Sequence, residues 1–130
     1  MARFDVYIAR VWFSELNGFR DRPIVQVKNN PNAPNSFAMI STTEKDLYAG
    51  DVPLTNPKEA GLKEENKPNR VRLAERLDLP KCLKTRKPIG ALDDEDAQNV
   101  AAALLVPHKI KKHYAEDLDD DISDLGFLTN

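Results

Sequence analysis

Apolar and polar residues alternate over several short stretches of the chain, and this pattern predicts a mostly β protein. The strongest stretch covers residues 5–13, where Val6, Ile8 and Val11 lie among aromatic residues. β-branched and aromatic residues at this spacing are typical of half-buried strands. Further strands are predicted at residues 23–28, 36–42, 52–55 and 69–77, with a weaker one at 82–89.

The segments between these strands are polar and rich in turn-forming residues. Residues 14–21 contain Asn17 and Gly18, and residues 29–35 hold four Asn and two Pro. Residues 57–68 are charged and have no hydrophobic period. Since Asn, Gly and Pro favour turns, we expect loops in all three segments.

Residues 93–105 carry the clearest helical pattern. Apolar residues recur there on one helical face, at Ala97, Val100, Ala101, Leu104 and Leu105. Asp93 suits the N-cap position, and the acidic residues after it suit the positive end of the helix dipole. Pro107 ends the helix. A second, weaker helix is predicted over 107–118.

Many short strands followed by one helix predict a small, mostly antiparallel sheet or half-open barrel with a helix packed against it. We expect the barrel and helix in residues 1–106 and a C-terminal extension, first basic and then acidic, in 107–130. The length of 130 residues fits one domain, and 41% hydrophobic with 31% charged residues is typical of a globular protein.

The location of the protein is predicted from three features of the sequence. No apolar stretch is long enough to cross a membrane, and the N-terminus has no long apolar signal region. The single cysteine, Cys82, cannot form an internal disulfide, which fits a reducing compartment. We therefore expect a cytoplasmic protein without a membrane partner.

The net charge of −2 conceals a strong asymmetry along the chain. Residues 115–130 hold six acidic and no basic residues, whereas residues 1–114 hold all 19 basic and 15 acidic residues, a net of +4. Such an asymmetry concerns partners more than fold. The tail is either a solubilising segment or one that docks, through its apolar residues, on the basic body or on a partner.

Two short runs carry candidate chemistry. Arg22 begins an Arg-Pro-Ile-Val run, and Thr42 and Thr43 end an Ile-Ser-Thr-Thr run. A guanidinium binds phosphate oxygens in a fixed fork, and beside a hydroxyl it suits phosphodiester chemistry that depends on positioning and charge stabilisation. The alternative is that Arg-Pro only marks a strand start and Thr-Thr is ordinary strand composition.

Residues 58–87 contain ten Lys or Arg and five acidic residues. Arg70, Arg72 and Arg76 have even spacing, so a regular strand would place them on one face, where they could follow a phosphate backbone. The alternative is a solvated charged face. The full set of candidate RNA-binding residues is Arg20, Arg70, Arg72, Arg76, Lys84 and Arg86.

No metal or cofactor is predicted. His108 and His113 are five residues apart, whereas metal-binding histidines on a helix prefer a spacing of four. The sequence has no glycine-rich phosphate loop and no His-Glu-x-x-His run.

In their order, these elements resemble the MazF/PemK (Kid-like) toxin family of bacterial toxin–antitoxin systems. The resemblance covers roughly residues 6–105. The matching segments are a Val-Trp-Phe strand at 11–13, the run from Arg22, the run ending at Thr43, a Val-Arg-Leu at 71–73, and the turn at 89–95 into the last helix.

The resemblance implies a small SH3-like barrel that forms a homodimer and binds an acidic antitoxin. It also implies a metal-independent endoribonuclease that cuts single-stranded RNA by attack of a 2′-hydroxyl on the adjacent phosphate. By the same resemblance, Arg22 would stabilise the phosphorane or shuttle a proton, and Thr42 would position the phosphate or hydroxyl. Thr43 is a neighbour that could take the place of Thr42.

The chain departs from the family pattern in three places. The first strand lacks the usual Gly-Asp, the loop before Arg22 is short and has no His, and the acidic tail is extra. Glu15 and Asp21 are the available acid–base candidates in that loop. We hypothesise that residues 115–130 imitate an antitoxin in cis and weaken RNA binding.

Two alternatives remain for a protein of this resemblance. The same fold in CcdB-like proteins poisons DNA gyrase without cutting anything, and that function would use the end of the helix, around residues 104–108, as the contact surface. The other alternative is an inactive relative that still binds RNA or a partner.

Overall fold

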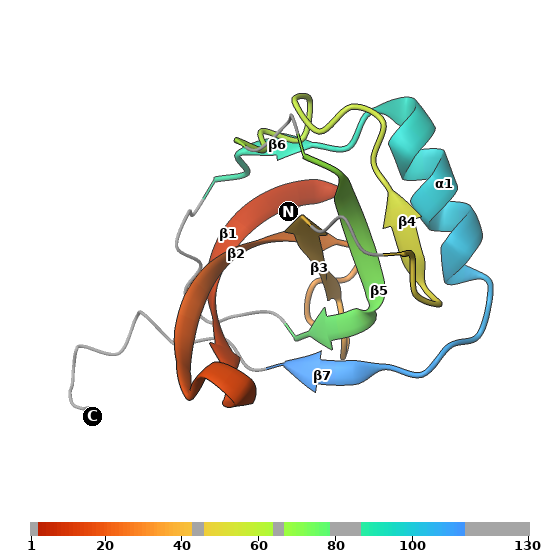
Figure 1. Cartoon of the computed structure of the whole chain (residues 1–130). Helices are drawn as coiled ribbons and strands as arrows, with labels where there is room; N and C mark the ends of the chain where they lie inside the picture. The colour runs from red at the N-terminus through yellow and green to blue at the C-terminus, as the bar shows by residue number, and fades with distance from the viewer. Residues whose placement is uncertain (1–2, 43–45, 64–66, 79–86, 114–130) are drawn as a thin grey trace.

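The computed structural model of the chain describes residues 3–42, 46–63, 67–78 and 87–113. Within these ranges the chain forms a curled sheet with an α-helix at one side (Figure 1). The strands are β1 (Asp5–Phe13), β2 (Gly18–Gln26), β3 (Phe37–Thr42), β4 (Asp51–Pro53), β5 (Asn69–Leu77), β6 (Gly90–Ala91) and β7 (Lys111–His113). The helices are the short 3₁₀ helix η1 (Ser14–Leu16) and α1 (Asp94–Leu104).

The order of strands in the sheet is β4-β5-β3-β2-β1-β6, and every neighbouring pair along this path is antiparallel. β7 adds to β5 in the parallel direction. The prediction of a mostly antiparallel sheet with one packed helix is therefore confirmed, in the form of a curled half-barrel. Within the described ranges, no helix is both long and apolar enough to cross a membrane.

The hairpin of β1 and β2 extends further than the sequence predicted. Residues 14–21 were expected to be a loop, but only η1 and Asn17 interrupt the strands, and β2 begins at Gly18. Asn17 adopts the left-handed conformation that a tight turn requires, with φ of 47°. Continuous pairing with β1, from Gly18 opposite Phe13 onward, outweighs the polar composition of residues 18–22.

Three smaller predictions also differ from the structure. The strand expected at 52–55 is β4, which begins one residue earlier and ends two residues earlier. The strand expected at 82–89 falls mostly on residues 79–86, outside the described ranges, and residues 87–89 are not a strand. The second helix expected over 107–118 is wrong for residues 107–113, because 107–110 form neither helix nor strand and 111–113 form β7, which pairs with β5. Residues 114–118 lie outside the described ranges.

Two apolar clusters occupy the two faces of the curled sheet. The helix-side cluster lies between the sheet and α1 and contains Val6, Val25, Val27, Ala38, Ile40, Val52, Ala60, Leu62, Val71, Leu73, Leu92 and Val100. The hairpin-side cluster contains Tyr7, Ala9, Val11, Ile24, Phe37, Met39 and Leu77. Neighbouring residues on β1, β2 and β3 alternate between the two clusters, as the pleat of a strand requires.

β5 changes faces part of the way along its length. Ala38 of β3 lies opposite Arg76, but the next residue, Met39, lies opposite Arg72, so residues 73–75 are inserted into the pairing. Residues directly opposite each other share a face of the sheet. Arg72 therefore lies on the face of the hairpin-side cluster and Arg76 on the face of the helix-side cluster. An insertion of this kind also bends the strand.

α1 is fixed to the loop after β4 by a buried carboxylate. Asp93 caps the helix as predicted, since its side chain accepts a hydrogen bond from the Asp96 backbone N–H at 2.9 Å. The buried Asp96 side chain accepts from the Thr55 N–H and hydroxyl, both at 2.9 Å, and from the Asn56 N–H at 3.0 Å. These bonds join two segments that are about forty positions apart in the sequence.

We predict that Asp96→Ala lowers the free energy of unfolding by about 2–3 kcal/mol, because it leaves several donors of the loop without an acceptor. Urea unfolding followed by circular dichroism measures this change. The control is Asp94→Ala on the exposed side of the same helix, for which we expect a loss below about 1 kcal/mol. Equal losses for the two variants would show that the loop contacts of Asp96 do not stabilise the fold.

Candidate functional site

β2 and β3 run beside each other for only part of their length. Residues 18–42 are all described, and within them β2 and β3 pair only where Ile24–Gln26 meets Phe37–Met39. β2 continues to pair with β1, and β3 continues to pair with β5, so the two strands diverge. At Pro23, β2 therefore has one neighbouring strand, which explains how a residue without an N–H donor fits inside it.

An open pocket of about 910 Å³ lies where the strands diverge. We call it the strand-gap pocket. It is lined by Ile8, Asp21, Arg22, Pro23, Ile40, Ser41, Thr42, Gly61, Leu62, Lys63, Asn69 and Ile89. Its lining combines apolar walls with several polar groups, which is typical of ligand sites.

The turn at Gly61 forms one wall of the strand-gap pocket. Gly61 has a φ of 76°, and a Cβ at this position would lie 2.3 Å from the carbonyl oxygen of Ile89. Both the conformation and the close approach require glycine. The wall therefore depends on a backbone contact between two segments that are distant in the sequence.

The structure brings three of the predicted site residues to this pocket. Asp21 and Arg22 come from β2, and Thr42 comes from the end of β3. Ser41, Lys63 and Asn69 also line it, although they were not among the predicted site residues. Asn69 lies opposite Thr42 on β5, a pairing that residue patterns alone do not reveal.

Arg22 and Thr42 leave the sheet on opposite faces. Arg22 lies opposite Ala9 of the hairpin-side cluster, whereas Thr42 follows the phase of Ile40 in the helix-side cluster. The guanidinium of Arg22 lies over the ring of Phe13, with Cζ 5.1 Å from the centroid, and donates to the Asp21 carbonyl oxygen at 2.9 Å. Both residues line the same pocket because β2 and β3 are separated there.

Asp21 presents a partly exposed carboxylate at the strand-gap pocket. Its Oδ1 lies 3.3 Å from Nε of Arg10, the residue opposite it on β1. Surface ion pairs of this kind contribute little to stability. Loss of this ion pair to a bound ligand would therefore cost little stability.

Glu15, the second acid–base candidate, does not line the strand-gap pocket. It lies in η1, and a hydrogen bond from its own backbone N–H holds the pKa of its carboxyl below the usual value, with a smaller effect from Lys111. Arg20 is also outside the lining, and its guanidinium donates to the Phe19 carbonyl oxygen at 2.7 Å.

The prediction that Arg70, Arg72 and Arg76 share one face is wrong. The insertion in β5 places Arg76 on the face opposite to Arg70 and Arg72. Arg76 is buried and donates to the carbonyl oxygens of Leu73 at 2.7 Å and Asn35 at 3.0 Å. Even spacing gives a common face only when the strand is regular.

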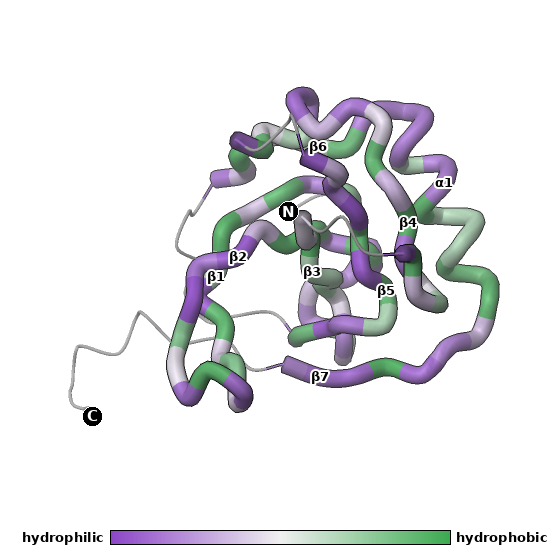
Figure 2. Tube along the Cα trace, in the orientation of Figure 1, coloured by the Kyte–Doolittle hydropathy of each residue, from purple (hydrophilic) through white to green (hydrophobic). Residues whose placement is uncertain are grey.

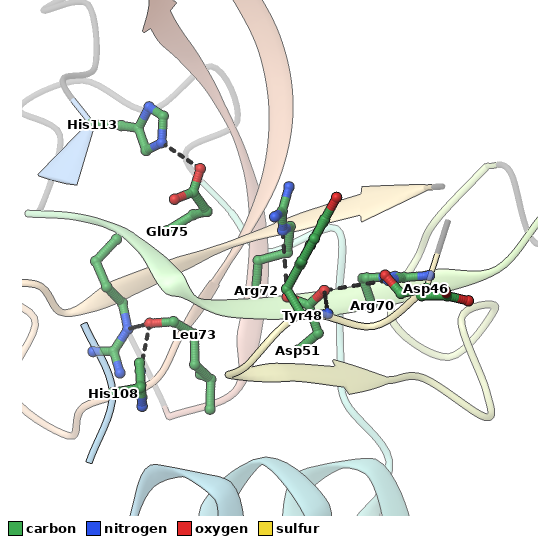
Figure 3. Close-up of polar contacts among 10 residues, drawn as sticks. Asp46, Tyr48, Asp51, Arg70, Arg72, Leu73, Glu75, His108 and His113 are labelled. Carbon is green, nitrogen blue, oxygen red and sulfur yellow. Dashed lines mark hydrogen bonds and ion pairs between the residues drawn. The ribbon is translucent and has the colours of Figure 1, made fainter. Parts of the chain in front are cut away.

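Arg70 and Arg72 are bound to one buried carboxylate (Figure 3). Asp51 of β4, whose side chain is only 1% exposed, lies 3.3 Å from Nη1 of Arg70 and 3.4 Å from Nε of Arg72. The ring of Tyr48 lies against Arg72, and the distance from Cζ of Arg72 to the centroid of the Tyr48 ring is 5.5 Å. These contacts give both arginines a structural role between β4 and β5.

Three predicted site residues cannot be located. Thr43, Lys84 and Arg86 lie outside the described ranges. Of the two threonines, the structure therefore places only Thr42, which lines the strand-gap pocket.

The two histidines have separate positions. Nε2 of His113 lies 3.0 Å from Oε1 of Glu75 (Figure 3), and its ring contacts Phe13 at a centroid distance of 5.5 Å. His108 instead bonds to the Leu73 carbonyl oxygen through Nε2 at 2.9 Å. In the described part of the chain, no three His, Cys, Asp or Glu side chains gather as potential metal ligands.

Comparison with known protein families found no family that matches this chain. Comparison with curated proteins likewise found no match. The case for a function therefore depends on the strand-gap pocket and on the resemblance of the sequence elements.

We predict that Asp51→Asn lowers the free energy of unfolding by about 3 kcal/mol, because it removes the charge that compensates two arginines. Asp46→Asn is the control, since the contact of Asp46 with Arg70 uses its backbone carbonyl oxygen; its expected loss is below about 0.5 kcal/mol. Thermal and urea unfolding measure both. A small effect at Asp51 would mean that β4 is held to β5 by backbone pairing alone.

Proposed function

We propose that this protein is an endoribonuclease of the MazF/PemK type, built on a small SH3-like barrel, that cleaves single-stranded RNA without a metal ion. One observation carries the proposal: Asp21, Arg22 and Thr42, from two strands that have diverged, line one open pocket. A carboxylate and a hydroxyl at one cavity, with a long arginine side chain that lines it and can turn its guanidinium inward, are suited to binding a phosphodiester and moving its protons.

In the proposed reaction the 2′-oxygen of a ribose forms a bond to the adjacent phosphorus, and the bond from phosphorus to the 5′-oxygen breaks. The products are a 2′,3′-cyclic phosphate and a 5′-hydroxyl. A base accepts the proton of the 2′-hydroxyl, and an acid donates a proton to the departing 5′-oxygen. Negative charge grows on the phosphoryl oxygens, so fixed cations and donors lower the barrier.

We assign these tasks to residues of the strand-gap pocket. The Asp21 carboxylate is the candidate base, and the Thr42 hydroxyl positions the phosphate. The ammonium of Lys63 is the candidate donor to the 5′-oxygen. Arg22 binds the phosphoryl oxygens after its long side chain moves off the Phe13 ring. This movement costs little, because a contact between a cation and an aromatic ring stabilises by only about 0.5–1 kcal/mol at exposed sites.

The hairpin beyond the pocket supplies a surface for bases. Trp12 and Phe19 lie opposite each other near its end, with ring centroids 5.1 Å apart. On β2, Phe19 has the same phase as Asp21, so the two lie on one face about 7 Å apart along the strand. Aromatic side chains stack on the bases of single strands, and this pair is placed to hold the nucleotide beside the one that is cut.

The partners follow from the same proposal. They are single-stranded RNA, a second copy of the chain in a homodimer, and an acidic antitoxin protein. The net charge of +4 on residues 1–114 favours both of the acidic partners. We also propose a cytoplasmic location, where these partners occur.

We predict that the full-length protein cuts a long single-stranded RNA in EDTA and leaves 5′-hydroxyl ends. Arg22→Ala removes charge stabilisation and is expected to slow cleavage about 100-fold or more. Thr42→Ala and Asp21→Asn are expected to slow it by a similar factor. Single-turnover cleavage of an end-labelled RNA measures these rates.

Glu15→Gln is the matched control, because Glu15 lies on the same hairpin but outside the pocket lining. We expect its rate to stay close to that of the unmodified protein. Cleavage that survives Arg22→Ala, or that depends on Glu15 more than on Asp21, would contradict the assignment. The absence of any cleavage by the full-length protein would contradict the enzyme itself.

The second candidate function is a binding module of the same type that poisons DNA gyrase without catalysis. One observation favours it: at the C-terminal end of α1, Leu105 is 85% and Val106 is 62% exposed. Large exposed apolar residues side by side often mark a protein contact. We predict that Leu105→Glu abolishes gyrase binding if this function holds and leaves RNA cleavage unchanged, which a gyrase pull-down and the cleavage assay distinguish.

A further inference from the structure

A second pocket, of about 480 Å³, lies beside the C-terminal end of α1. We call it the helix-end pocket. Its lining residues are Arg3, Val27, Lys28, Asn29, Arg76, Leu104, Val106, Pro107, His108 and Ile110. None of these residues lines the strand-gap pocket.

The helix-end pocket is positively charged. Arg3, Lys28 and Arg76 contribute three cations, and no carboxylate is among the described residues that line it. Each cation donates to a backbone carbonyl oxygen: Arg3 to Val27 at 3.2 Å, Lys28 to Pro34 at 2.6 Å, and Arg76 to Leu73 at 2.7 Å. Carbonyl oxygens satisfy hydrogen bonds but carry no full negative charge. Of the three cations, Lys28 also interacts electrostatically with the Asp78 carboxylate, whose pKa is lowered chiefly by the Asn35 N–H and to a smaller extent by Lys112 and Lys28.

The burial of Arg76 makes this charge costly. Arg76 is 3% exposed, and desolvation lowers the pKa of its guanidinium. The nearby carboxylate of Asp78 does not line the pocket, since it pairs with Lys112 at 2.6 Å and accepts from the Asn35 N–H at 2.6 Å. An anionic group bound in the pocket would stabilise the charged form of Arg76.

The rim of the helix-end pocket is apolar. Val106 is 62% and Ile110 is 45% exposed, and Leu104 and Pro107 join them in the lining. Figure 2 shows apolar positions at the end of α1 and along the segment that leads to β7. An occupant that matches the whole site therefore combines negative charge with apolar side chains.

The chain itself contains a segment of this composition. Residues 116–128 hold six acidic residues. Ile122 lies among them, and three apolar residues follow the last one: Leu125, Phe127 and Leu128. The described part of the chain ends at His113, three positions after Ile110 of the pocket rim. Nine residues from His113 to Ile122 span up to about 30 Å when extended, which is ample for a return to the pocket.

We propose that the acidic C-terminal segment, residues 116–128, binds in the helix-end pocket of its own chain. Its carboxylates pair with Arg3, Lys28 and Arg76, and its apolar residues cover Val106 and Ile110. Tethering favours this intramolecular contact, since the short linker gives the segment a high effective concentration at the site. The proposal does not depend on the ribonuclease activity.

The test places a nitroxide spin label on the segment in the full-length protein. Ser123→Cys carries the label in a Cys82→Ser background, and the backbone amide signals are recorded with the label oxidised and reduced. We expect the amides of Val106, His108 and Ile110 to lose most of their intensity when the label is oxidised. Raising the salt to about 0.5 M, where the Debye length falls well below 10 Å, restores part of that intensity.

Charge-reversal variants test the pocket directly. Lys28→Glu places a negative charge in the lining, and we expect it to restore most of the lost intensity at Val106 and Ile110. Lys58→Glu is the matched control, an exposed lysine outside the helix-end pocket, and it leaves the loss unchanged. The unlabelled amide spectrum of each variant establishes that it is folded.

Several outcomes would overturn the proposal. They are no intensity loss at the pocket, equal effects of Lys28→Glu and Lys58→Glu, or a loss centred on the strand-gap pocket. Mixing labelled chains with isotopically enriched unlabelled chains separates contacts within a chain from contacts between copies. An intensity loss seen only between copies would assign the pocket to the tail of a second copy. RNA is excluded as the occupant if an added probe RNA does not restore the intensity that the spin label removes at the pocket.

Discussion

The insertion of residues 73–75 in β5 is the constraint on which the arrangement of this molecule depends. Val71, before it, and Leu73, its first residue, enter the helix-side cluster, whereas Leu77, after it, enters the hairpin-side cluster. The same strand therefore closes both apolar faces of the curled sheet. The bend also brings the end of β5 alongside β7, which adds the last strand. In a regular β5 of this sequence, Leu77 would lie on the same face as Val71 and Leu73, because residues at even spacing share a face.

Charge follows the same division. Arg70 and Arg72, before the insertion, share the buried carboxylate of Asp51, whereas Arg76, after it, donates only to carbonyl oxygens in the contacts described above. Arg70 and Arg72 hold β4 to β5 through this carboxylate, whereas Arg76, which forms no ion pair with the described residues, lines the helix-end pocket. Charged residues that look alike along the sequence thus differ in role, because their partners come from other strands.

Both pockets occur where the sheet is interrupted. The strand-gap pocket exists because β2 and β3 pair at only three positions. The helix-end pocket lies where α1 ends beside residues 27–29, which follow β2. The proposed RNA site and the proposed tail site are therefore separate. An acidic tail that binds at the helix end leaves Asp21, Arg22 and Thr42 accessible, so its effect on RNA would come from its charge rather than from steric cover.

The sequence alone determined the features that depend on local patterns. Alternation predicted β1 and most of β3 and β5, and the apolar period with Asp93 at its start predicted α1, because both patterns reflect burial of one face. The sequence also singled out Arg22 and Thr42. Only the tertiary structure decided that β2 starts at Gly18, that Arg76 leaves the face of Arg72, and that Lys63 and Asn69 join the pocket. These outcomes depend on pairing between strands far apart in the chain, and no local pattern records such pairing.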